Sequence, residues 1–89
     1  MRGYIVYYYN SCFVKFFNRY EDVLNDKVID TKAKLVFRMD SLRHFMHNCD
    51  REEIFDFNHD LKLKGETDIN KYASVKNLLN ELEADAILE

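Results

Sequence analysis

The sequence has no proline or tryptophan, and it has only two glycines and two cysteines in 89 residues. The scarcity of proline and glycine excludes collagen-like, proline-rich and flexible-linker classes. Gly3 and Gly65 cannot form the glycine-rich loop of a phosphate or dinucleotide site, because such loops need several closely spaced glycines. Cys12 and Cys49 are too few for a disulfide scaffold. What remains is a small globular domain that must fold without covalent cross-links.

Long apolar runs are also missing. No stretch approaches the roughly 20 apolar residues that cross a bilayer, and Arg2 is followed by a short aromatic run rather than by the apolar core of a signal peptide. We therefore expect a reduced, cytoplasmic protein with no membrane segment. The net charge of −3 argues against nucleic-acid binding through bulk charge. The frequent Lys, Asn, Asp, Tyr, Phe and Ile are typical of AT-rich coding sequences, as in many viral and phage genomes.

The residues that are present have an ordinary globular balance, with 47% hydrophobic and 33% charged residues. Aromatic side chains make up 15% of the chain, which is high. A chain of this length has room for one core, so we expect a single domain over residues 1–89.

The first third of the chain allows two interpretations. Residues 4–9 are β-branched and aromatic and predict a central strand. The apolar residues that follow have the spacing of one helix face, which predicts a helix from near Ser11 to near Asn25: Phe13, Phe16, Phe17, Tyr20, Val23 and Leu24. The alternative is a hairpin that joins 4–9 to 12–17 through Asn10 and Ser11. We favour the helix, because Asn-Ser is a weaker hairpin turn than Asn-Gly.

Two further strands are expected later in the chain. Residues 34–39 alternate between polar and apolar positions, as in a half-buried strand, and a short helix follows that carries Leu42, Phe45, Met46 and Cys49. Residues 55–64 alternate most clearly, because Phe55, Phe57, His59, Leu61 and Leu63 occupy the odd positions. This pattern predicts one long strand, or a hairpin that turns at residues 58–60.

The last helix is expected to begin at Thr67 or Asp68, after Gly65 breaks the strand, and to carry an apolar stripe: Tyr72, Val75, Leu79, Leu82 and Ala86. The order is then β-α-β-α-β-α. We expect an α+β fold, a small two-layer sandwich with a mixed three-stranded sheet and all helices on one face. The most buried residues should include Phe16, Phe17, Tyr20, Leu79 and Leu82.

No residue pattern indicates catalysis. His44 and His47 could share a helix face, but Cys49 lies about 140° away from His44 around a helix, so a zinc site is disfavoured. Asp56, Asp60 and Lys62 have a nuclease-like order, yet no third carboxylate accompanies them. Glu52 and Glu53 are best explained as solvated charges. We expect no enzyme activity, no cofactor and no bound metal.

The open face of the expected sheet is the candidate binding surface. The central strand would contribute Tyr4 and Tyr8, or else Tyr7 and Tyr9, and the other strands would contribute basic residues. The candidate binding residues are Tyr7, Tyr8, Tyr9, Lys34, Arg38, Lys62 and Lys64. Tyrosine and arginine are enriched in protein-binding hot spots, and aromatic and basic residues on a sheet also stack single-stranded nucleic acid. An alternative is that another part of the chain covers these tyrosines.

The leading hypothesis is a non-enzymatic protein-binding module, a small regulator or inhibitor of a larger protein whose identity the sequence does not reveal. The alternative is a single-stranded nucleic-acid binder that uses the tyrosine and basic face, and a metal-dependent nuclease ranks third. The charge order of residues 55–64 also predicts a homodimer, in which two antiparallel strands place Asp56 opposite Lys64.

Overall fold

The computed structural model describes residues 3–26 and 34–85. A four-stranded antiparallel sheet forms the centre, in the order β3-β1-β2-β4. The elements in chain order are β1 (Tyr4–Tyr8), β2 (Phe13–Phe17), α1 (Tyr20–Asn25), β3 (Lys34–Arg38), α2 (Met39–Met46), α3 (Arg51–Lys64), β4 (Glu66–Asp68), the 3-10 helix η2 (Ile69–Lys71) and α4 (Ala73–Asp85). The described residues therefore form a small α+β domain, as expected, but with four strands rather than three and with an antiparallel rather than a mixed sheet.

The first two strands form a hairpin, which is the interpretation that the sequence pattern favoured less than a helix. Tyr8 pairs with Phe13, and Tyr4 pairs with Phe17. The turn is closed by the amide of Ser11, which donates to the carbonyl oxygen of Tyr8 (3.2 Å), and Cys12 has a positive φ of 57°. The predicted helix over 11–25 is therefore wrong for its first half. The aromatic residues of 13–17 suit a strand better than a helix interior, and only Tyr20–Asn25 is helical.

The expected central and half-buried strands are confirmed. β1 lies between β3 and β2 in the sheet. In β3, Leu35 and Phe37 are partly buried against the main core, whereas Val36 and Arg38 are exposed. The chain then passes directly into α2, where Leu42 and Met46 are buried as the helical spacing predicts. Phe45 of the same predicted stripe is exposed, and Cys49 is buried but lies beyond the end of the helix.

Residues 55–64, predicted to be a strand or a hairpin, are part of helix α3 instead. Asp50 caps the helix by accepting hydrogen bonds from the amides of Glu52 (2.9 Å) and Glu53 (3.1 Å). Gly65 ends it in the left-handed conformation, with φ 78° and its amide donating to the carbonyl oxygen of Leu61. The predicted homodimer, in which two such strands pair antiparallel, therefore cannot form in that way, because the segment is a helix.

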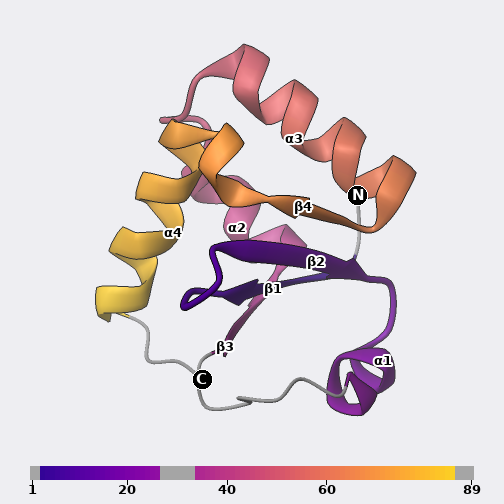
Figure 1. The fold of residues 1–89 in the computed structure, drawn as a ribbon. Helices are drawn as coiled ribbons and strands as arrows, with labels where there is room; N and C mark the ends of the chain where they lie inside the picture. Colours follow the sequence, from indigo (N-terminus) through magenta and orange to yellow (C-terminus); the bar gives the residue numbers. More distant parts are fainter. Residues whose placement is uncertain (1–2, 27–33, 86–89) are drawn as a thin grey trace.

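Helices lie on both sides of the sheet (Figure 1). The larger core lies between the sheet and α2, α3 and α4, and it contains Ile5 and Tyr7 from β1. The other face of β1 carries Val6 and Tyr8, which pack with Val23 of α1. The expectation that all helices share one face is thus wrong for α1.

The residues predicted to be most buried differ in how far they are buried. Leu79 is fully buried, and Tyr20 is half exposed. Phe16, Phe17 and Leu82 are partly buried. The last helix begins at Ala73 and not at Thr67 or Asp68, because residues 66–68 pair with β2 as strand β4. Tyr72 just before the helix and Val75 within it are buried as expected, while Ala86 lies outside the described residues. Among the helices of the described residues, none is both long and apolar enough to span a membrane.

Candidate binding surface on α2 and α3

The three tyrosines of the predicted binding face do not lie together on an open surface. Tyr7 is 1% exposed, and its hydroxyl donates to Oδ1 of Asn80 (2.7 Å). Tyr8 is 6% exposed on the opposite face of the sheet. Tyr9 is half-buried and packs edge-on against Tyr7, with ring centroids 6.2 Å apart. The first two rings therefore cannot stack on a ligand from solvent in this fold.

The predicted basic residues are also separated. Arg38 is exposed at the end of β3, opposite Tyr4 in the register. Lys34 begins the same strand, and its side chain lies outside the described part of the structure. Lys62 and Lys64 are exposed, but they belong to α3 and not to the sheet. Among the side chains that the structure describes, the composite face of tyrosines and basic residues is therefore not formed.

A small cluster of contacts surrounds Tyr8 on the second face of the sheet. The Tyr8 hydroxyl donates to Asp26, whose carboxylate also accepts from Nζ of Lys15 at 3.2 Å. Burial, followed by the hydrogen bond to Asp26, raises the pKa of Tyr8 well above its usual value. The lysine also lies over the Tyr8 ring, 5.7 Å from its centroid. These contacts tie the segment after α1 to the hairpin.

Helix α3 carries two apolar series on opposite sides. Phe57 and Leu61, four residues apart, are buried in the main core. Phe55 and Leu63 are 71% and 70% exposed, and they are separated by two helical turns. His59 lies between them, and its ring stacks on that of Phe55 at 6.5 Å with an interplanar angle of 4°. We call Phe55, His59 and Leu63 the outer stripe.

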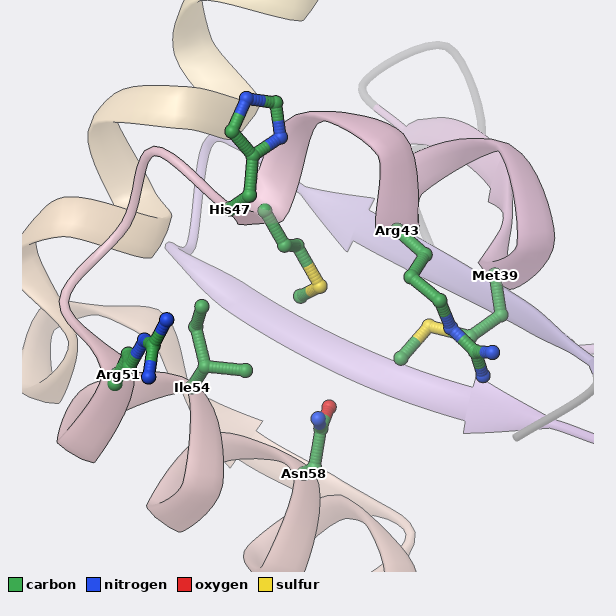
Figure 2. A pocket seen from close by; sticks show the side chains of 7 residues that line it. Met39, Arg43, His47, Arg51, Ile54 and Asn58 are labelled. Carbon is green, nitrogen blue, oxygen red and sulfur yellow. The ribbon is translucent and has the colours of Figure 1, made fainter.

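A groove separates α2 from α3 (Figure 2), with a volume of about 380 Å³. Seven side chains line it: Met39, Arg43, Met46, His47, Arg51, Ile54 and Asn58. The two methionines are buried and Ile54 is half-buried, so the base of the groove is apolar. Arg43, His47 and Arg51 are exposed at its rim. The groove combines an apolar base with basic groups, in a protein that is acidic overall.

Two of the acidic residues near Arg51 are occupied elsewhere, whereas Glu52, which follows it directly, is exposed. Oδ1 of Asp50 accepts the amides that begin α3. Oε1 of Glu53 accepts from the amide (2.9 Å) and hydroxyl (3.0 Å) of Ser74, near the start of α4. Within residues 3–26 and 34–85, no ion pair is formed by Arg51 or His47. The Nδ1–H of His47 donates to the carbonyl oxygen of His44 (2.7 Å), which leaves its Nε2 toward solvent.

One acceptor in the groove has no donor. Oδ1 of Asn58 is buried and is without a hydrogen-bond partner among the described residues. Its side chain points from α3 into the groove (Figure 2). An unsatisfied buried acceptor costs about 1–3 kcal/mol. The oxygen itself has almost no exposed surface, so it is not open to a ligand from the groove.

Other chemistry has little support in the described part of the chain. Among residues 3–26 and 34–85, no three His, Cys, Asp or Glu side chains are placed to hold a metal ion. Burial raises the pKa of the Cys49 thiol, which lies 3.6 Å from the carbonyl oxygen of Ser74. A buried thiol with a raised pKa is a poor nucleophile.

The sequence analysis did not identify the groove or the outer stripe as a surface. The sequence does contain a signal for α3, because Asp50 and Glu53 have the spacing of a capping box and Gly65 follows 12 residues after Glu53. A helix between these signals would have placed Phe55 opposite Phe57.

Comparison of the chain with protein-family models, with curated proteins and with solved structures found no match.

Proposed function

We propose that this protein is a non-enzymatic protein-binding module, a small regulator or inhibitor that contacts a larger protein through the outer stripe of α3. The observation that carries the proposal is the exposure of Phe55 and Leu63 on the side of the helix that faces away from the core. Large apolar residues lined up on an exposed helix face are typical of helices that dock into a groove of a partner.

The outer stripe is not needed for folding. The core side of α3 is already supplied by Phe57, Leu61 and Ile54. An exposed Phe and an exposed Leu add nothing to that core, and they increase the tendency to associate. A contact with another protein gives these residues a role that the fold does not.

The residues around the outer stripe favour a specific contact over nonspecific association. The ring of Phe55 is held by stacking on His59, so less freedom is lost when a partner covers it. Glu52 and Asp56 are exposed beside Phe55, and Lys62 is exposed beside Leu63. Apolar centres with charged rims are the usual anatomy of non-obligate interfaces.

The experiment is affinity capture with the immobilised full chain from the cells in which it is naturally made, followed by purification of the captured protein. Binding to the purified partner is then measured for the wild type and for the Phe55→Ser/Leu63→Ser variant. We expect the variant to weaken binding at least about tenfold, because central apolar contacts contribute more than about 1.4 kcal/mol.

The matched control is Tyr20→Ser/Leu24→Ser on α1. This pair also combines an exposed aromatic residue with an exposed leucine on one helix, at 50% and 65% exposure. The control should bind like the wild type. Equal losses in both double variants, or no captured protein that depends on Phe55 and Leu63, would contradict the proposal.

The alternative of single-stranded nucleic-acid binding has weaker support, because Tyr7 and Tyr8 are buried and Lys62 and Lys64 lie on a helix. A capture that nuclease treatment abolishes, and that falls steeply with added salt, would favour it over protein binding. Sedimentation of the purified chain at micromolar concentration separates a second copy of this chain from a different partner.

A further inference from the structure

We propose that the groove between α2 and α3 binds an acidic peptide segment of the partner, with one bulky apolar side chain in the groove and adjacent carboxylates on the arginines. This inference rests on the proposed function and names the chemistry of the partner. The groove has two features that such a segment requires: an apolar base and basic groups at the rim.

The apolar base suits a single large side chain. Met39, Met46 and Ile54 line it, and a volume of about 380 Å³ is at the lower end of ligand sites. Methionine side chains adapt to apolar groups of different shape. A leucine or phenylalanine of a peptide fits this space, whereas a large cofactor does not.

The rim determines the charge of the ligand. Arg43 and Arg51 approach the groove from α2 and α3, and His47 follows α2 (Figure 2). Arg51 has no ion pair within the described residues, although Glu52 and Asp56 line the neighbouring hollow with it. Its guanidinium can form a bidentate contact with an incoming carboxylate. Basic groups in an otherwise acidic protein select an acidic segment.

The ligand is inferred to be a peptide because the proposed partner is a protein. A segment of a protein chain brings apolar and acidic side chains next to one another, as the base and the rim of the groove require.

The groove and the outer stripe belong to one continuous surface. Arg51 lines the groove, and it also lines a second hollow on α3 together with Glu52, Phe55 and Asp56. A partner that covers Phe55 therefore reaches the groove at Arg51. The acidic segment and the apolar contact on the stripe can come from the same molecule.

The test is a fluorescence-polarisation titration of the full chain with a labelled peptide amide, Glu-Asp-Leu-Phe-Glu-Asp. Two matched probes accompany it, Gln-Asn-Leu-Phe-Gln-Asn without the charges and Glu-Asp-Gly-Ser-Glu-Asp without the apolar side chains. We expect saturable binding of the first peptide, at least about tenfold tighter than of either probe, and weakening by salt. Amide chemical shifts should change at Arg43, Arg51 and Asn58.

Variants locate the binding. Arg51→Glu should weaken the peptide at least about tenfold, since a charge-assisted bidentate contact is replaced by repulsion. Arg19→Glu changes the net charge equally at an exposed site near α1, where the arginine pairs with Glu21. It should leave the affinity unchanged.

Several results would overturn the inference: no binding of the acidic peptide at millimolar concentration, equal binding of the uncharged or the Gly-Ser probe, or equal losses in the Arg51 and Arg19 variants. Binding of an oligothymidylate that depends on Arg51, without peptide binding, would also overturn it. If partner capture still depends on Phe55 and Leu63 while the peptide fails to bind, this inference fails and the proposed function stands.

Discussion

Truncation of Phe57 should lower the stability of the fold strongly and truncation of Phe55 very little, although the two residues are only two positions apart. Phe57 is 0% exposed, and its ring meets that of Tyr72 edge-on, with centroids 5.4 Å apart. Removal of a buried phenylalanine costs about 3–5 kcal/mol. Phe55 is mostly exposed, and substitutions at such sites usually stay within about 0.5 kcal/mol. In a helix the two residues lie about 200° apart, whereas in a strand they would share a face.

The assay is urea unfolding at 25 °C, followed by far-UV circular dichroism, for the wild type, Phe57→Ala and Phe55→Ala. A domain of this size has a total stability of about 4–13 kcal/mol, so Phe57→Ala removes a large part of it. With an m value of about 1–2 kcal/mol/M, a loss of about 4 kcal/mol lowers the midpoint by about 2–4 M. The Phe55→Ala midpoint should stay close to that of the wild type.

A second pair repeats the comparison one turn further along. Leu61 is buried and Leu63 is exposed, so Leu61→Ala should cost about 2–5 kcal/mol and Leu63→Ala very little. Equal losses within either pair would refute the helical assignment of this segment, and with it the outer stripe.

Three further predictions concern the helix end, alkaline pH and the thiols. Gly65→Ala should cost about 1 kcal/mol in urea unfolding, because φ is positive there although a Cβ would meet nothing within 4 Å, and Gly65→Asn should cost less. The raised pKa of Tyr8 means that the folded state favours the neutral phenol, so its stabilisation is complete below the usual pKa of about 10 and is lost as the pH rises further. Urea midpoints measured against pH should therefore fall above about pH 10, and less steeply in Tyr8→Phe. In a Cys12→Ala variant, Cys49 should react with Ellman's reagent only as fast as the protein opens, because burial raises its pKa, and immediate labelling would contradict this.

The alternation of residues 55–63 shows why the sequence pattern misled. Phe57 and Leu61 form one series at a spacing of four, and Phe55, His59 and Leu63 form another on the far side of the helix. Together the two series occupy every odd position from 55 to 63, which is the alternation expected of a strand. The usual helical pattern requires the outer face to be polar, so apolar residues kept there for another purpose conceal the helix.

Local patterns did predict β1, because its β-branched and aromatic residues are large on both faces, as in a central strand. They also predicted β3, the short helix after β3 and the buried residues of the last helix, because each has one apolar face. β4 was missed because it is only three residues long and depends on pairing with β2. The carbonyl oxygen of Gly65 accepts from the amide of Phe16 (2.8 Å), and the carbonyl of Cys12 accepts from the amide of Ile69 (2.9 Å). No sequence pattern encodes these distant contacts.

The groove could not be predicted for the same reason. Arg43 and Arg51 lie on different helices, and Asn58 comes a further seven residues along α3. Only the packing of α2 and α3 against the sheet brings them to one cavity. The predicted tyrosine face failed because the hairpin places Tyr7 and Tyr8 on opposite sides of the sheet and helices cover both sides.

The most direct test of the outer stripe is photo-crosslinking in the cells in which the protein is naturally made, with benzoyl-phenylalanine placed at His59 and, as a control, at Glu21 on α1. Both positions are exposed, so both can react with whatever lies against them. The account predicts a discrete protein adduct from position 59 that disappears when Phe55→Ser is added, and no such adduct from position 21. Adducts of equal yield from both positions, or no protein adduct from position 59, would contradict it.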